Sequence, residues 1–91
     1  MTLAELYLIE KDRIKILSLH YARMYKAERE DLLQEGALAV VETHNNYADR
    51  LDDEELLKVS HRIVNRKMYK YARNEYRHKV SKTQTNATEK D

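Results

Sequence analysis

Apolar residues recur along the first part of the chain at the three- and four-residue steps of an amphipathic helix. The main stripe consists of Leu3, Tyr7, Ile14, Leu17, Tyr21 and Met24. Glu10 is the one break in it, and Thr2 and Glu5 match a capping box before the apolar run. The spacing therefore predicts a helix from Thr2 to about Lys26. Further apolar positions widen its face, so we expect it to be covered on two sides: Leu6, Ile9 and Ile16.

A second apolar stretch follows a short connection at about residues 27–30. Its apolar members are Leu32, Leu33, Leu38, Val40, Val41 and Tyr47. Glu30 or Asp31 lies near its start, where a carboxylate suits the unpaired amides of a helix N-terminus. Gly36 lies inside this helix, where glycine costs up to ~1 kcal/mol relative to alanine. We expect another backbone to approach closely there.

A third helix is predicted after a connecting loop at residues 45–53. Asp52 or Asp53 is its expected cap. Its apolar positions are Leu56, Leu57, Val59, Ile63, Val64, Met68, Tyr71 and Ala72. We expect it to end at about His78 or Lys79, before a disordered polar tail at 81–91. The predicted fold is all-α: a compact bundle over residues 1–80 of three helices, or of four if the first is broken.

The length and amino-acid composition of the chain exclude several kinds of functional site. A chain of 91 residues forms one domain at most and has little room for an enclosed pocket. It contains no cysteine and no proline, and Gly36 is its single glycine. Disulfides, thiolate metal sites and a cysteine nucleophile are thereby excluded. Because neither a signal-peptide pattern nor an apolar run long enough for a membrane span is present, we expect a cytoplasmic protein.

The chemistry-bearing residues do not form a catalytic pattern. The four histidines, His20, His44, His61 and His78, do not pair with carboxylates in a recognised metal-ligand motif. The acids at 52–55 suit capping and the helix dipole. There is neither a glycine-rich phosphate loop nor a serine in a nucleophile setting. We therefore expect no enzyme, catalytic residue, metal, cofactor or small-molecule substrate.

Charge is distributed unevenly behind a net value of +1. Residues 58–82 hold nine Lys and Arg against Glu75 alone, whereas residues 48–57 hold five acids against Arg50. Six cations repeat at steps of four, four, four, three and four: Lys58, Arg62, Arg66, Lys70, Arg73 and Arg77. This basic stripe, flanked by His61, Lys67 and Lys79, can neutralise phosphates. A solvated helix face is the alternative. Tyr71 is expected in the core, whereas Tyr69 and Tyr76 suit either the core or stacking on unpaired bases.

The segment 31–42, Asp-Leu-Leu-Gln-Glu-Gly-Ala-Leu-Ala-Val-Val-Glu, resembles the D-L-[IV]-Q-E-G-x-[IL]-G-L-x-x-A stretch in conserved region 2 of bacterial RNA polymerase sigma factors. The order of elements agrees. A helix containing Tyr21-Ala22-Arg23-Met24-Tyr25 precedes the segment, and an aromatic-containing loop and a basic helix follow it. The similarity covers about residues 12–78 and implies a region-2-like bundle.

The resemblance implies a partner, since in sigma factors this helix docks on the clamp helices of the polymerase β′ subunit. The residues implied in docking are Asp31, Gln34, Glu35, Ala37 and Val41. Ala37 replaces the polar residue common after the glycine, and Ala39 replaces the second glycine. Both substitutions keep the surface small and able to pack.

The resemblance also implies promoter DNA as a ligand of the third helix, through Lys58, His61, Arg62, Arg66, Lys67, Lys70, Arg73 and Arg77. The aromatic pair that captures flipped bases in sigma factors corresponds here to His61 and Arg62, so we expect polymerase docking rather than promoter melting. The polar tail cannot encode the helix-turn-helix of region 4. We therefore expect a region-2 module that stands alone.

The resulting hypothesis is a sigma-like subunit that binds core RNA polymerase and promoter DNA, with a separate protein supplying region 4. Three alternatives stay open. The chain is a phage or mobile-element regulator that competes with a host sigma factor, a small nucleic-acid-binding helical protein without polymerase contact, or a helical interaction module. In the last case the stripe from Leu3 to Met24 is an exposed seam.

Overall fold

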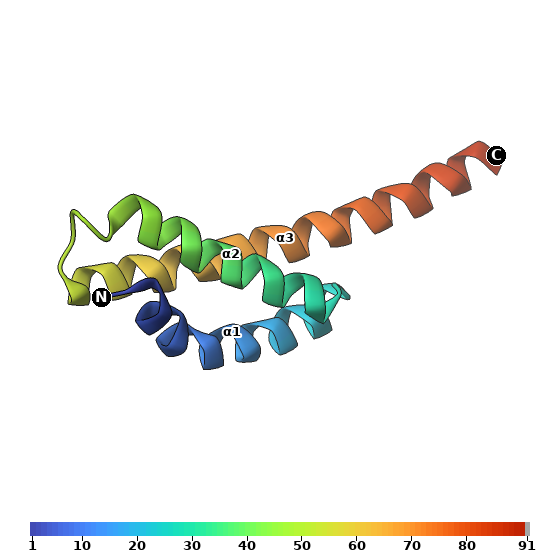
Figure 1. Ribbon diagram of the computed structural model, residues 1–91. Coiled ribbons are helices and arrows are strands. Elements are labelled where there is room, and N and C mark those ends of the chain that lie inside the picture. Colours follow the sequence, from blue (N-terminus) through green and yellow to red (C-terminus); the bar gives the residue numbers. More distant parts are fainter. Residues whose placement is uncertain (91) are drawn as a thin grey trace.

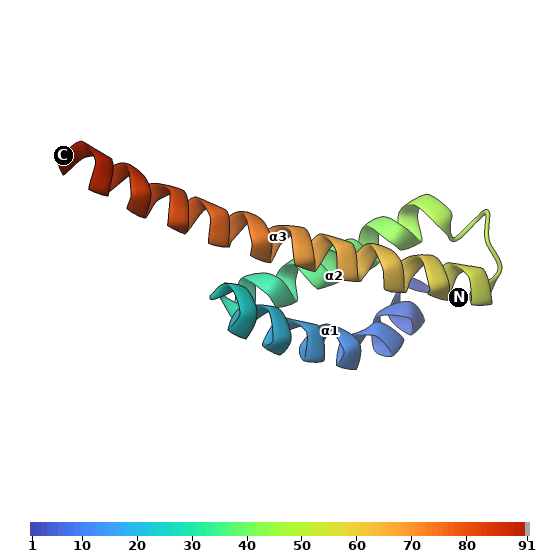
Figure 2. The same cartoon turned by 180° about the vertical axis from the view of Figure 1, so that it is seen from behind.

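Three helices make up the bundle: α1 (Leu3–Tyr25), α2 (Arg29–Tyr47) and α3 (Asp53–Lys90). The computed structural model describes the backbone of residues 1–90 and the side chains of residues 1–78. Consecutive helices run in opposite directions, and α3 packs against both α1 and α2 and continues past them at one end (Figures 1 and 2). The all-α three-helix prediction is confirmed, and the first helix is unbroken.

The ends of α1 and α2 follow local chemistry. The capping box is present: the Thr2 amide donates to Glu5 Oε1 at 2.9 Å, and the Glu5 amide donates to Thr2 Oγ1 at 3.1 Å. Lys26 ends α1 in the left-handed conformation, at φ 57°. The connection is shorter than expected, since α2 begins at Arg29 and not after residue 30. Glu30 and Asp31 lie in its first turn, where the helix dipole favours acids.

The connection between α2 and α3 is also shorter than the predicted loop, because α2 continues to Tyr47. The Glu55 amide donates to Asp52 Oδ1 at 2.8 Å, which confirms Asp52 as the cap. At the other end the helical backbone of α3 runs to Lys90, past the expected end at 78 or 79. The predicted polar tail, 81–91, lies outside the residues whose side chains are described.

The core lies where the three helices meet. Its buried members come from every helix: Leu6, Ile14, Tyr21, Ala27, Leu32, Ala39, Val40, Leu56, Val64, Met68 and Ala72. Gly36 is buried among them. A Cβ built there would lie 2.7 Å from Ile14 Cγ2 and 3.0 Å from Met68 Sδ. Close packing at Gly36 therefore involves side chains of α1 and α3, and not the neighbouring backbone that the sequence suggested.

Glu10, the break in the apolar stripe of α1, is fully buried in the bundle. The expectation that α1 is covered on two sides fails at Ile9 and Ile16, which are 46% and 67% exposed, whereas Leu6 is fully buried. Tyr7 and Met24, placed in the main stripe, are 41% and 53% exposed. The helix buries one face against α2 and α3 and leaves apolar residues on its outer side.

Candidate functional site

The outer side of α2 carries the segment that resembles the sigma factors. Its buried positions, Leu32, Gly36, Ala39, Val40 and Thr43, face the bundle. Residues three and four apart share a helix face, so Gln34, Ala37 and Val41 form one outer row, and Asp31, Glu35 and Leu38 form the row beside it. Asp31, Gln34 and Val41 are exposed, whereas Glu35 and Ala37 are half-buried. The five residues implied in docking thus lie on two adjacent rows of one helix.

Apolar groups interrupt this polar surface. Leu38 and Val41 are 51% and 38% exposed, although both count among the apolar positions of the predicted helix. Along the outer side of α2 they lie between Gln34, in its second turn, and Asn45, near its C-terminal end. The surface therefore combines an acidic and amide end with an apolar centre, an arrangement that suits a protein partner.

Asp31 is linked to α3. The Tyr71 hydroxyl donates to Asp31 Oδ2 at 3.1 Å. Burial raises the pKa of Tyr71 to about 12, with the Asp31 hydrogen bond and the nearby carboxylates of Glu75 and Glu35 acting in the same direction. Tyr71 is half-buried and packs against the core, in agreement with the sequence. One of the implied docking residues therefore also serves to hold α2 against α3.

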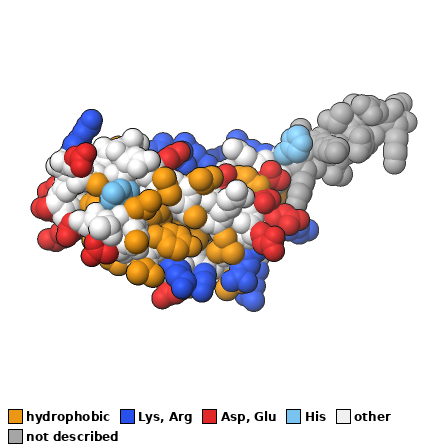
Figure 3. Space-filling view, viewed as in Figure 1, with side chains coloured by type: hydrophobic (Ala, Val, Ile, Leu, Met, Phe, Trp, Pro, Cys, Tyr) orange, Lys and Arg blue, Asp and Glu red, His pale blue; other side chains and the backbone are white. Residues whose placement is uncertain are grey.

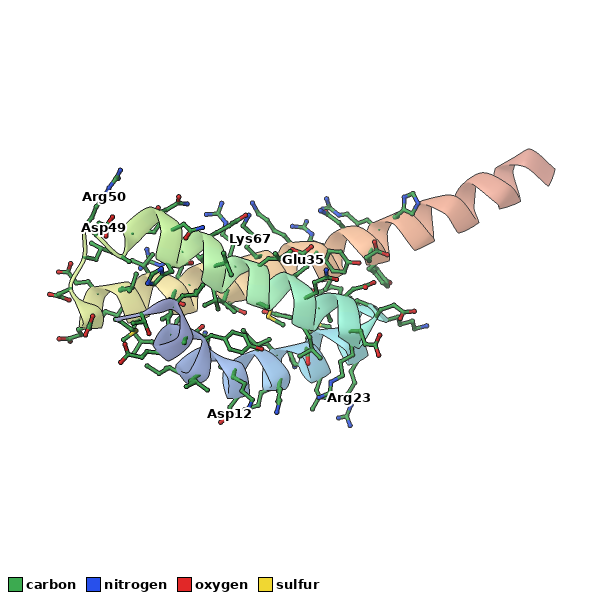
Figure 4. The ribbon with its side chains drawn as sticks, in the orientation of Figure 1. Asp12, Arg23, Glu35, Asp49, Arg50 and Lys67 are labelled. Carbon is green, nitrogen blue, oxygen red and sulfur yellow. The ribbon has the colours of Figure 1, made fainter. Side chains whose placement is uncertain are left out.

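The basic stripe lies on the outer side of α3. All six members, Lys58, Arg62, Arg66, Lys70, Arg73 and Arg77, are exposed. Lys58 Nζ lies 3.6 Å from Glu54 Oε1, and Lys67 Nζ lies 3.1 Å from Glu42 Oε2 on α2. Among residues 1–78 the other stripe members form no ion pair within 4.0 Å. In Figure 3 Lys and Arg side chains follow the upper edge of the molecule, where Figure 4 places Lys67.

A groove of about 350 Å³ separates the stripe from α2. Its lining residues are Glu42, Thr43, Asn46, Tyr47, Ile63, Arg66, Lys67 and Lys70. Arg66 and Lys70 are thus exposed to solvent and also line this recess, whose other lining residues are mostly polar. Sequence reasoning missed the groove, because half of its wall comes from α2, some twenty residues away in sequence, and only packing brings the two halves together.

His61 differs from the rest of the predicted nucleic-acid-binding set. Its Nδ1 contacts Oε1 of Glu10 on α1, so its ring is turned toward the bundle. The sequence contains no motif that would indicate this contact, because Glu10 and His61 belong to different helices. Buried polar atoms of Arg13 and Ser60 lie at the same α1–α3 junction. Burial raises the pKa of Glu10, while the charges of His61 and Arg13 lower it by less.

Four tyrosines pack together where α1 meets the middle of α3. The ring centres of Tyr25 and Tyr69 lie 5.9 Å apart, and those of Tyr25 and Tyr76 lie 6.0 Å apart, both edge to face. Tyr21 joins the group, and its hydroxyl donates to Asn65 Oδ1 at 2.6 Å. Tyr69 is half-buried in this cluster. Tyr76 is 43% exposed and is the member with most ring surface open to solvent.

Within the described residues, His, Asp and Glu nowhere gather into a group of three that could hold a metal ion. None of the described helices has an apolar stretch that could cross a lipid bilayer. No family model, curated protein or solved structure matches this chain. The resemblance described above therefore rests on the segment 31–42 and on the order of helices around it.

Proposed function

We propose that this chain is a sigma-like transcription protein that binds the β′ clamp helices of core RNA polymerase through the outer side of α2. In this proposal α3 presents its basic stripe to promoter DNA, and a separate protein supplies region 4. The observation that carries the proposal is the position of the sigma-like segment. Its polar residues Asp31 and Gln34 are exposed on α2, next to a helix whose cations Arg62 and Arg66 form no ion pair with any side chain of residues 1–78.

The polymerase contact is tested by retention on immobilised β′ clamp helices. The double variant Gln34→Ala, Glu35→Ala removes one amide and one carboxylate from the proposed surface, and we expect retention to fall at least about tenfold. The matched control, Asn46→Ala with Asp49→Ala, removes the same chemical groups from exposed positions outside this surface, at the C-terminal end of α2 and in the turn that follows it. Equal retention of the wild type and the Gln34, Glu35 variant would show that the docking surface is wrong.

The DNA contact is tested with a forked promoter fragment. Arg62→Glu with Arg66→Glu reverses two charges one helical turn apart, so affinity should fall and depend less steeply on salt. Lys11→Glu with Lys15→Glu makes the same charge change at the same spacing, at exposed positions of α1. Equal losses for the two variants would mean that net charge and not the stripe decides binding.

The second candidate function is competition with a host sigma factor for the clamp helices. It is favoured by His61, because this residue corresponds to an aromatic position in sigma factors and its ring is turned toward Glu10. A competitor inhibits transcription by a complete polymerase holoenzyme, whereas a sigma-like subunit supports transcription when its region 4 partner is added to core enzyme. DNA binding without clamp-helix binding would instead support the small nucleic-acid-binding protein.

A further inference from the structure

Helix α1 has a second regular stripe on the side that faces away from the bundle. The six residues, which we call the outer seam, follow steps of four, three, four, three and four: Glu5, Ile9, Asp12, Ile16, Leu19 and Arg23. All six are exposed, and Ile9, Ile16 and Leu19 are 46%, 67% and 48% exposed. Alternating steps of three and four are the spacing at which two helices pair along their length.

The seam borders a shallow groove toward the C-terminal end of α1. The groove measures about 520 Å³ and is lined by Ile16, Leu19, His20, Arg23 and Met24. Toward the other end Leu8 is 66% exposed beside the seam. Single apolar residues on a surface are ordinary, whereas several exposed apolar residues close together, bordered by charged ones, are typical of an interface. Figure 3 shows hydrophobic side chains gathered over this side of the molecule.

The charges on the outer seam are arranged so that the seam of one copy is complementary to the seam of a second, antiparallel copy. Its acids, Glu5 and Asp12, lie in the N-terminal half, and its cation, Arg23, lies at the C-terminal end. Figure 4 shows Asp12 and Arg23 on the side of α1 away from the other helices. Residues 5 and 23, 9 and 19, and 12 and 16 are each centred on residue 14. An antiparallel second copy therefore places Glu5 opposite Arg23, and Ile9 opposite Leu19.

A parallel copy would instead bring each charge against the same charge. The remaining charged residue of the seam, Asp12, faces Ile16 of the other copy in the antiparallel arrangement. Lys15 precedes that isoleucine in sequence and can act as the cationic partner of Asp12. We propose that the outer seam pairs with α1 of a second copy in an antiparallel, two-fold symmetric dimer. The proposed contacts on α2 and α3 lie on other sides of the bundle, so this dimer does not rest on the proposed function.

The first test uses disulfide formation, for which the absence of cysteine is an advantage. Ile9→Cys and Leu19→Cys each introduce a single thiol. The two positions lie about 15 Å apart along one helix, too far for residue 9 or 19 to reach its own copy in an antiparallel pair. We expect a mixture of the two variants to form the mixed disulfide at least about tenfold faster than either variant alone forms its own. Faster self-linking indicates a parallel pair, and equal rates indicate no pairing; either overturns the proposal.

The second test is sedimentation equilibrium of the unmodified chain and of Ile16→Glu. Because the seam is one helix pair, it buries less than the roughly 1,600 Å² of a standard interface, and we expect a dissociation constant on the order of 10 μM or weaker. Ile16→Glu occurs twice in each dimer and sets Glu against Asp12, so the constant should rise at least about 100-fold.

Lys11→Glu, exposed on α1 outside the seam, is the control and should leave the constant within about threefold of the unmodified chain, as expected for a rim position. Circular dichroism checks that Ile16→Glu keeps its helical content, as its exposure predicts. A chain that stays monomeric up to about 1 mM, or an Ile16→Glu variant that dimerises like the wild type, shows that the outer seam does not pair with itself.

Discussion

Two groups of charged side chains on α3 differ in where they find their partners. His61 is turned inward against Glu10 of α1, and Arg62, the next residue, is turned outward and forms no ion pair among the described residues. At the α1–α3 junction the Glu10 side chain is fully buried, and its pKa depends on burial and on the nearby His61 and Arg13. Charges on the basic stripe remain solvated and contribute little to folding. The residue of α3 that contacts the buried Glu10 and the residues proposed to bind DNA are therefore different, and variants can separate their effects.

The largest effect is expected for Glu10→Ala. The substitution leaves a cavity at a fully buried position and removes the partner of His61, so the free energy of unfolding should fall by about 2–4 kcal/mol. Urea unfolding followed by circular dichroism measures the loss. A loss of unfolding free energy as small as that of a surface substitution would mean that the Glu10–His61 contact stabilises the fold no more than the exposed basic stripe does.

Gly36→Ala should have the next largest effect. The added methyl would lie 2.7 Å from Ile14 Cγ2, which is attached directly to a branched Cβ and cannot swing away. Overpacking of this kind costs about 1–3 kcal/mol and outweighs the gain in helix propensity of up to ~1 kcal/mol. Gln34→Ala on the exposed side of α2 is the control. Thermal unfolding of an equally stable or more stable Gly36→Ala variant would contradict the packing.

The pH dependence of stability should distinguish the junction from the stripe. Because burial raises the pKa of Glu10, the folded protein holds this proton more tightly than the unfolded chain does. Stability from this group is fully present below the ordinary pKa of 4.5 and is lost as pH rises through the higher folded pKa. The wild type should therefore gain stability relative to Glu10→Gln as pH falls from neutrality toward 4.5. Parallel unfolding curves at every pH would exclude this linkage.

The smallest effect is expected for Arg62→Glu with Arg66→Glu. Both side chains are exposed, so the free energy of unfolding should change by no more than about 0.5 kcal/mol per residue. Thermal melts of this variant, prepared for the DNA experiment, supply the measurement. A loss similar to that of Glu10→Ala would show that the basic stripe stabilises the fold as much as the buried junction does, which would contradict the difference between the two groups.

The helices were predictable because their signals are local. The capping box at Thr2 and Glu5, the cap at Asp52 and the apolar spacing each need only a few neighbouring residues. The burial of Glu10 could not be predicted from the sequence, because a charged residue inside an apolar stripe carries no local sign of a buried partner. Its contact, His61, lies about fifty residues further along the chain, and nothing local connects the two.

The candidate site divides in the same way. Helical spacing alone indicates that Arg62, Arg66 and Arg73 share a face, and the structure places that face in solvent. Helical spacing does not show which apolar residues of α1 stay exposed, because Ile9 and Ile16 are residue types that are usually buried. The groove beside Arg66 needs α2 and α3 to be packed before it exists.

The hydrogen bond between Tyr71 and Asp31 joins the outer surface of α2 to α3. A ligand that takes the Asp31 carboxylate for itself must displace the phenol, and α3 then loses one of its attachments to α2. Conversely, a ligand on α3 that moves Tyr71 weakens its hydrogen bond to Asp31 and leaves the Asp31 carboxylate more available to a ligand on α2. If both surfaces bind ligands as proposed, this hydrogen bond couples the two binding events, and each ligand changes the affinity for the other by the same factor.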